Sequence, residues 1–358
     1  MYIRWTSSKE NQGECRLETL IHYMNKDNTY QYRLSVIVAI YNVEPYLERC
    51  LESIVHQDLS KDEYEVLLIN DGSTDRSLEI AKRYEAEYTN FIVYSKENGG
   101  LSSVRNFGIE HSHGRFIMHV DADDFLEENV IGKVVKVAED KELDLCFFRY
   151  ISHPDGRKID LFWNFSKYKL YTGEWLLLNN MKVTSTWCGI YNHSFLDKSG
   201  IEYFGRISHQ DVEYNYRLYP LAKRVMFTDY YVYHYSIEGE SITRTKDIKK
   251  KQQNLLDNLQ IAHNIKNYAN SGKCNTPIRR FLNRKMNSIV VAFLLSFLRK
   301  ENTYSYGFIK EFINQAEIKG VYPCGRTYSW KTTVLLLLVN IKPLYLLSAR
   351  ILNSSKNC

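Results

Sequence analysis

The feature that most constrains the fold is a series of short apolar segments, each followed by a helical pattern. Residues 34–40, 65–69, 91–94 and 116–120 are apolar almost throughout, which is typical of strands buried on both faces of a sheet. The stretches between them carry apolar residues at helical spacing. Strands and helices that alternate with short connections predict right-handed βαβ units. We therefore predict an α/β fold with a Rossmann-like, mostly parallel central sheet.

The charge of the chain is unevenly distributed along its 358 residues. Residues 241–358 hold 20 Lys and Arg but only 5 Asp and Glu, although the formal net charge of the whole chain is only +5. We expect a polar N-terminal extension at 1–32, an α/β domain at 33–240, and a mainly helical, basic region at 241–358. Such a basic region predicts a negatively charged partner, either nucleic acid or anionic lipid.

An apolar stretch at 330–352 lies within this basic region. Polar residues and Pro343 interrupt it, so that it lacks the roughly 20 clean apolar residues of a membrane-spanning helix. We expect it to lie on a membrane surface, with Trp330 and Tyr345 at the interface and basic side chains reaching lipid phosphates. The alternative is a helix packed on the protein's own core.

The location of the protein follows from its first residues and its cysteines. The first 30 residues contain no apolar segment of the kind found in secretory signals. The seven cysteines are scattered and form no CxxC pair, which fits a reducing compartment. We expect a cytoplasmic protein, bound peripherally to the inner face of the cell membrane.

Three carboxylates follow the fourth predicted strand directly, as Asp121, Asp123 and Asp124. Like charges this close are unfavourable unless a cation or hydrogen-bond donors offset them, and carboxylates are the ligands that Mg²⁺ and Mn²⁺ prefer. Mg²⁺ typically binds through one or two carboxylates plus substrate phosphates. Because ligands of open parallel sheets bind beyond the carboxyl ends of the strands, the pattern favours a metal–diphosphate site over a surface turn.

A second polar loop, at 70–75, follows the second predicted strand. Gly72 permits a tight turn, and Ser73 or Thr74 can cap the next helix, so an ordinary turn explains most of the loop. Asp71 is left over. It is an acceptor to which a nucleobase or a ribose could donate.

Four motifs, at 35–57, 65–77, 97–109 and 114–129, together resemble the family 2 glycosyltransferases with a GT-A fold. The resemblance covers about 34–240, and its later part is similar to bacterial capsule, O-antigen and exopolysaccharide enzymes. It implies an inverting enzyme that moves one sugar from a nucleotide-sugar, with a UDP-sugar as the expected donor. The implied acceptor is a glycan or lipid-linked molecule, and the implied cofactor is Mn²⁺ or Mg²⁺.

The resemblance also implies a role for each matching residue. Asp211 would be the general base that deprotonates the acceptor hydroxyl. Asp123 would bind the metal ion, with His234 as a further ligand. Trp187 and Gln210 would lie on the acceptor side. The residues that would bind the donor are Ala39, Tyr41, Asp71, Arg105 and Asp121.

The chain departs from the family pattern at two positions. Gln210 stands where the family usually has a Glu before the base, and it keeps the hydrogen-bonding reach but loses the charge. Gly189 stands where relatives often carry a Lys. Neither change removes a group that the reaction needs.

Two other functions were weighed against glycosyl transfer. A dinucleotide oxidoreductase is disfavoured because no GxGxxG motif follows residues 34–40. The alternative is a non-catalytic adaptor on the same scaffold, which would bind membrane or nucleic acid through its basic tail. The presence of Asp123 and Asp211 counts against it. For the enzyme, nucleic acid is not an expected partner, and the sequence does not predict an oligomeric state.

Overall fold

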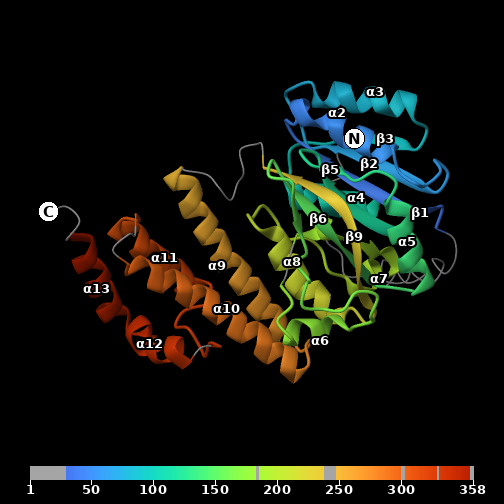
Figure 1. The fold of residues 1–358 in the computed structure, drawn as a ribbon. Coiled ribbons are helices and arrows are strands. Elements are labelled where there is room, and N and C mark those ends of the chain that lie inside the picture. Colours follow the sequence, from blue (N-terminus) through green and yellow to red (C-terminus); the bar gives the residue numbers. More distant parts are fainter. Residues whose placement is uncertain (1–29, 183–184, 238–246, 300–302, 329, 355–358) are drawn as a thin grey trace, which may run out of the picture.

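The computed structural model describes residues 30–182, 185–237, 247–299, 303–328 and 330–354. Residues 1–29, nearly all of the expected N-terminal extension, lie outside the described residues. The first 200 or so described residues form a sheet covered by helices, and the C-terminal helices follow beside it (Figure 1).

The first four strands form the parallel half of the sheet. They are β1 (Tyr32–Ile40), β2 (Tyr64–Asn70), β3 (Phe91–Ser95) and β4 (Gly114–Asp121). Their order is β3-β2-β1-β4, and all three neighbouring pairs are parallel, as predicted. Every residue of β2 is buried, which explains why the run lacks polar alternation. The carboxyl ends of these strands therefore meet at one edge of the sheet.

Helices connect these strands on both faces of the sheet. They are α2 (Glu44–Val55), α3 (Ser77–Glu87), α4 (Leu101–Glu110) and, after β4, α5 (Ile131–Asp140). The helices α2 and α3 contact each other and lie together above the sheet in Figure 1. Helix α4 packs closely on β1 and β2, because Gly108 has no side chain. A Cβ atom at Gly108 would come within 2.5 Å of the Ile37 side chain.

The other half of the sheet is mixed. Its strands are β5 (Phe125–Leu126), β6 (Leu145–His153), β7 (Arg157–Ile159), β8 (Gly189–Asn192) and β9 (Val225–Ser236). The strand β8 joins β4 in antiparallel fashion, and β6, β9 and β5 follow it, with β7 paired to β6. Among these added strands only β6 and β9 are parallel. The sequence did not predict β5, β7 and β8, because strands of two to four residues have no readable periodicity.

Short helices lie between these later strands. They are α6 (Gly173–Leu178), the 3₁₀ helix η1 (Thr186–Cys188), α7 (His193–Ser199), α8 (Gln210–Leu218) and the 3₁₀ helix η2 (Tyr219–Leu221). Helix α8 begins after His209, whose φ of 59° is left-handed. This reversal starts the helix at the carboxyl edge of the sheet, where its first turn faces β4.

The C-terminal region is helical, as predicted. Its helices are α9 (Ile248–Asn270), α10 (Thr276–Phe297), α11 (Tyr306–Ile318), α12 (Trp330–Asn340) and α13 (Lys342–Ser354). Helix α9 lies between α8 and α10 and contacts both (Figure 1). Within the described part of the chain, no single helix is both long and apolar enough to cross a bilayer. The helices α12 and α13 meet that test only as a pair, and they are bent by 85°.

The inner side of α13 packs on the protein, as the alternative interpretation expected. Tyr345 is fully buried, and its hydroxyl donates to the carbonyl of Leu294 at 2.7 Å. The prediction that Tyr345 lies at a membrane interface is therefore wrong. Lys342 is also engaged within the protein, where its Nζ donates to Glu317 and to Asn314.

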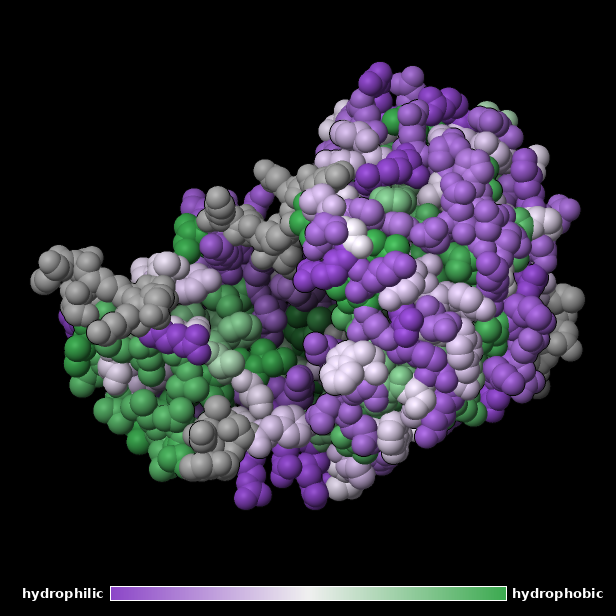
Figure 2. Space-filling view, in the orientation of Figure 1, coloured by the Kyte–Doolittle hydropathy of each residue, from purple (hydrophilic) through white to green (hydrophobic). Residues whose placement is uncertain are grey.

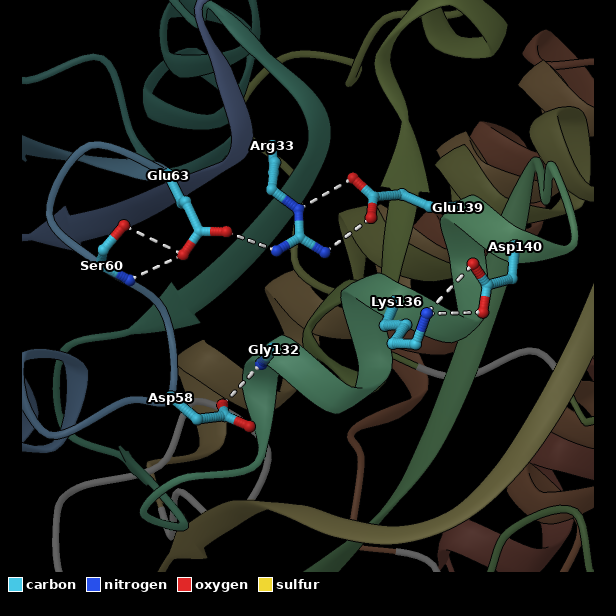
Figure 3. A network of polar contacts seen from close by, with 8 residues as sticks. All are labelled: Arg33, Asp58, Ser60, Glu63, Gly132, Lys136, Glu139 and Asp140. Carbon is cyan, nitrogen blue, oxygen red and sulfur yellow. Dashed lines mark hydrogen bonds and ion pairs between the residues drawn. The ribbon is translucent and has the colours of Figure 1, made fainter.

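An ion-pair network closes the opposite, amino end of β1 (Figure 3). The Arg33 guanidinium donates to Glu63 at 2.6 Å and to both carboxylate oxygens of Glu139 at 3.0 and 2.6 Å. Nearby, Asp58 accepts a bond of 2.7 Å from the backbone amide of Gly132. These contacts join β1, the loop before β2 and α5 at the end of the sheet that lies away from the polar loops.

Candidate active site

A cavity of about 610 Å³ opens at the carboxyl ends of the parallel strands. Such a volume is in the range of pockets that hold small ligands. The predicted site residues that line it are Ala39, Tyr41, Asp71, Asp121, Asp123, Trp187, Gln210 and Asp211. The other two predicted residues, Arg105 and His234, are not among its lining residues.

The three carboxylates after β4 differ in their surroundings. Asp124 is held by the protein, because its oxygens accept from the Ser236 amide at 2.7 Å and from the Tyr233 hydroxyl at 2.8 Å. Burial and the charges of Asp121 and Asp123 raise the pKa of Asp124 to about 8. Asp123 is also largely buried, and burial together with the charge of Asp121 raises its pKa to about 6.

The surroundings of Asp123 suit a bound cation. Among the described residues, no side chain of another residue forms a hydrogen bond or ion pair with its carboxylate, and the nearby acidic charge is unfavourable for it. A divalent cation would offset this cost. The described side chains offer no group of three His, Cys, Asp or Glu that could hold a metal ion alone. Asp123 therefore fits the kind of Mg²⁺ or Mn²⁺ site in which substrate phosphates and water supply the remaining ligands.

Arg105 lies beneath the cavity and joins two carboxylates from different elements. Its Nη2 donates to Asp121 at the end of β4, at 3.0 Å, and its Nη1 donates to Asp211 in α8. The side chain is only 1% exposed. The resemblance implied that Arg105 binds the donor. In the structure, however, Arg105 does not form part of the cavity wall. It compensates the two acidic charges and fixes their positions from below.

Asp211 lies in the first turn of α8 and faces the cavity. Besides Arg105, the Thr186 hydroxyl donates to it at 3.4 Å. Burial raises the pKa of Asp211, whereas the charge of Arg105 acts in the opposite direction. The helix N-terminus favours the ionised carboxylate as well. Asp211 is thus a carboxylate held in a fixed position at the wall of the cavity.

Asp71 faces the cavity, but protein groups already use most of its acceptor capacity. It accepts from the Lys96 ammonium at 2.8 Å and from the backbone amides of Gly99 and Gly100 at 2.8 and 2.7 Å. A carboxylate has about four acceptor positions, so roughly one is left for a ligand. Asp71 therefore also shapes the loop before α4, a role that the sequence did not reveal. Lys96 could have been found, because it directly follows β3 at the same edge.

Trp187 and His234 have mainly packing contacts. The Trp187 ring stacks on Tyr233, with ring centres 4.3 Å apart, and on Tyr235 at 5.5 Å. His234 lies between these two tyrosines on β9, and because successive side chains of a strand face opposite sides, it does not share their side. Its ring stacks on Phe125 and contacts His153 at 2.8 Å and Glu127 at 2.9 Å. The structure does not bring His234 to the cavity with Asp123.

A polar link joins the C-terminal helices to the site. Asp257 of α9 accepts from the backbone amide of Ser208 at 2.9 Å and from the Ser208 hydroxyl at 2.8 Å. Ser208 directly precedes His209, which lines the cavity, and lies three residues before Asp211. Helix α9 therefore supports the turn from which Asp211 projects.

Comparison with known sequences supports the resemblance to a glycosyltransferase family. The sequence model described as Glycosyl transferase family 2 matches residues 35–200, a range that contains the strands around the cavity. We call this matched range the family 2 domain. The match ends before α8, so it does not include Asp211.

Relatives of the family 2 domain occur among bacterial proteins. The chain is 39% identical over 122 residues to the minor teichoic acid biosynthesis protein GgaB of Bacillus subtilis, which is 33% of this chain and 14% of GgaB. It is 30% identical over 236 residues to the uncharacterized glycosyltransferase YibD of Escherichia coli, which is 62% of this chain and 65% of YibD. The chain thus spans less than two thirds of these relatives.

A solved structure shares the architecture of the family 2 domain and of the helices after it. The structure of S. aureus TarS 1–349 in complex with UDP-GlcNAc superposes with a TM-score of 0.65 at 19% identity, over 91% of each chain. This likeness shows a GT-A fold with C-terminal helices.

The structure explains one departure from the family pattern. Gly189 begins β8, and a Cβ atom there would lie 2.7 Å from the carbonyl oxygen of Cys146 on β6. A Lys at Gly189 would therefore require β8 and β6 to separate. Gln210 lines the cavity of the family 2 domain and is buried, and nothing in the structure explains why it replaces a Glu.

Proposed function

We propose that this chain is an inverting, metal-dependent glycosyltransferase of bacterial surface polysaccharide synthesis. It moves a single sugar from a UDP-sugar to a glycan or lipid-linked acceptor. The observation that carries the proposal is that Asp121, Asp123 and Asp211 meet at one cavity of a family 2 domain. The names of GgaB and TarS, one a teichoic acid protein and the other seen with UDP-GlcNAc, support the donor and the pathway class.

The donor is held at the carboxyl edge of the sheet. Ala39 and Tyr41 line the cavity at the end of β1, and Asp71 lies beside them with one acceptor position left. Asp123 would hold Mn²⁺ or Mg²⁺, and such an ion would supply Lewis-acid neutralisation of the charge on the leaving diphosphate. In this proposal Asp121, whose carboxylate pairs with Arg105, accepts a hydrogen bond from the ribose.

Asp211 removes the proton from the acceptor hydroxyl as that oxygen attacks the anomeric carbon. A new C–O bond forms while the bond to the diphosphate oxygen breaks, and the nucleotide leaves with the electron pair. Attack from the face opposite the leaving group inverts the anomeric centre. The reaction requires an ionised Asp211, which the ion pair with Arg105 favours.

The decisive experiment measures donor binding by thermal shift. We expect UDP with Mn²⁺ to raise the melting temperature of the wild type more than UDP alone. The variant Asp123→Asn has nearly the same size, so it should retain the fold and lose only the part of the shift that depends on Mn²⁺. Asp155→Asn, an exposed carboxylate, is the matched control. Absence of a shift with any nucleoside diphosphate would instead support the non-catalytic adaptor.

A further inference from the structure

The outer side of the last two helices is apolar and exposed. Leu337 is 74% exposed, although it belongs to a run of six consecutive aliphatic residues in α12. Figure 2 shows hydrophobic residues gathered at the lower left of the molecule, in the region of α12 and α13. We define the α12–α13 face by its large exposed aliphatic side chains, which are Val334, Leu335, Leu337, Ile341, Leu344, Leu347 and Ile351.

Within the residues that the structure describes, the protein does not cover this face. Val339, Tyr345 and Ala349 point inward and are fully buried, so both helices already have their packing side. A helix that is apolar on all sides is typical of a protein core or of contact with lipid. Because Leu337 is exposed, the core of this chain does not supply the apolar surroundings that α12 requires.

The dimensions of the two helices favour a position along a bilayer surface. They have 11 and 13 residues, which corresponds to about 16 and 20 Å at 1.5 Å per residue. The hydrocarbon core of a bilayer is about 30 Å thick, so neither helix crosses it alone. The bend of 85° between them also disfavours one continuous span. Helix α13, which carries basic and polar residues beside its apolar ones, is of the amphipathic kind that lies in the interface with its apolar side chains below the headgroups.

The charge of this segment indicates which surface it meets. Residues 318–358 contain six Lys and Arg and no Asp or Glu. Exposed Glu317, at the border of the segment, is paired with Lys342. Anionic lipid headgroups attract such a segment, whereas a second copy would not, because the same basic surface would face itself across a two-fold axis.

We infer that the α12–α13 face binds the surface of an anionic phospholipid bilayer. The helices lie in the plane of the interface, with Leu337 and Leu347 among the acyl chains and the basic residues beside the phosphates. This binding agrees with the peripheral location at the inner membrane face expected from the sequence. It does not depend on the proposed catalysis.

The test is sedimentation of the full chain with two kinds of vesicle, phosphatidylcholine alone and an equimolar mixture with phosphatidylglycerol. We expect binding to the mixed vesicles that falls as salt is raised. The double variant Leu337→Glu with Leu347→Glu should bind at least about tenfold less, because it lacks the two leucine side chains that enter the acyl region of the bilayer. Leu178→Glu, which replaces an exposed leucine of α6 outside this face, should bind like the wild type.

Circular dichroism and thermal melting verify that each variant is folded. If the glutamates disturb the helices, the double variant Leu337→Ser with Leu347→Ser is used instead. It should also bind the mixed vesicles less than the wild type, but with a smaller loss. Equal binding to neutral vesicles, or unchanged binding of a folded double variant, would overturn the inference. A second outcome would also overturn the inference. If the wild type does not bind vesicles but forms a dimer, and the double variant is a monomer, the face is a protein interface.

Discussion

At the scale of single residues, the electrostatics of the site depend on Arg105. It is the buried cation between Asp121 and Asp211, which come from β4 and α8. Without it, two acidic groups would face each other in a poorly solvated place. Breaking a buried ion pair by removing one partner typically costs about 3 to 5 kcal/mol. Arg105 is therefore a positioning residue whose loss affects both folding and the proposed base.

We predict that Arg105→Met lowers the free energy of unfolding by about 3 to 5 kcal/mol. Urea titration measures this, and Arg83→Met, which breaks an exposed pair with Glu48, should change it little. The charge of Arg105 lowers the pKa of Asp211, so its removal raises that pKa. Because the proposed base must be ionised, the acid limb of the pH–rate profile should move to higher pH. A profile that does not move would mean that Asp211 is not the titrating base.

The role of Asp211 itself is tested by Asp211→Asn. The amide keeps the size of the side chain but cannot take a proton, so transfer to the acceptor should fall by about 10²-fold or more. The thermal shift with UDP should remain, because Asp211 is expected to act on the acceptor. Product formation and donor binding are measured on the same preparation. Turnover equal to that of the wild type would require another base.

At the scale of elements, the site depends on how closely α4 approaches the sheet. Arg105 and Gly108 lie on the same helix, and Gly108 allows α4 to approach Ile37 of β1 and Ile69 of β2. The distance between this helix and the sheet thus sets where the guanidinium lies relative to β4.

We predict that Gly108→Val destabilises the protein by about 1 to 3 kcal/mol, because the added carbons overlap Ile37 and Ile69. It should also weaken the shift caused by UDP, since α4 carries Arg105. Urea unfolding and the thermal shift measure the two effects. Gly307→Ala in α11, where a Cβ atom meets only a distant Ser305, should show neither. If the stability of Gly108→Val is unchanged, α4 can move away from the sheet without cost, and its close approach does not set the site.

The elements also show what the sequence could predict. The long apolar runs predicted both ends of β1, β2 and β4 to within two residues. Strands buried on both faces are apolar at successive positions, and this pattern is visible in the sequence. Eight of the ten predicted site residues line one cavity, since the ends of parallel strands share an edge. The direction of His234 depends on which residues of β9 face inward, and its sequence is aromatic on both faces. The contact of Arg105 with Asp211 joins segments 106 residues apart, for which a single sequence contains no signal.

At the scale of the whole molecule, the basic helices and the family 2 domain are physically joined at the site. Asp257 of α9 holds the turn at Ser208, and α9 in turn packs on α10. The sequence predicted a helical region here but gave no reason to place it against the proposed base.

We predict that Asp257→Ala lowers the rate of transfer by about tenfold while the shift caused by UDP stays the same. The reason is that the turn before Asp211 loses two hydrogen bonds, whereas the donor side of the cavity is untouched. Steady-state kinetics and thermal shift measure the two sides separately. Asp257→Asn keeps one acceptor oxygen and should recover part of the rate. A parallel loss of UDP binding would show that the change spreads through the whole fold.

The link between Asp257 and Ser208 has a consequence for protein engineering. Chimeras that exchange the helical portions of two related enzymes would separate an aspartate from the serine it was matched to. Residues 208 and 257 should then be transplanted together, as one unit on both sides of the junction. A hybrid that respects only the boundary in the chain would keep the proposed donor side of the cavity but hold Asp211 loosely.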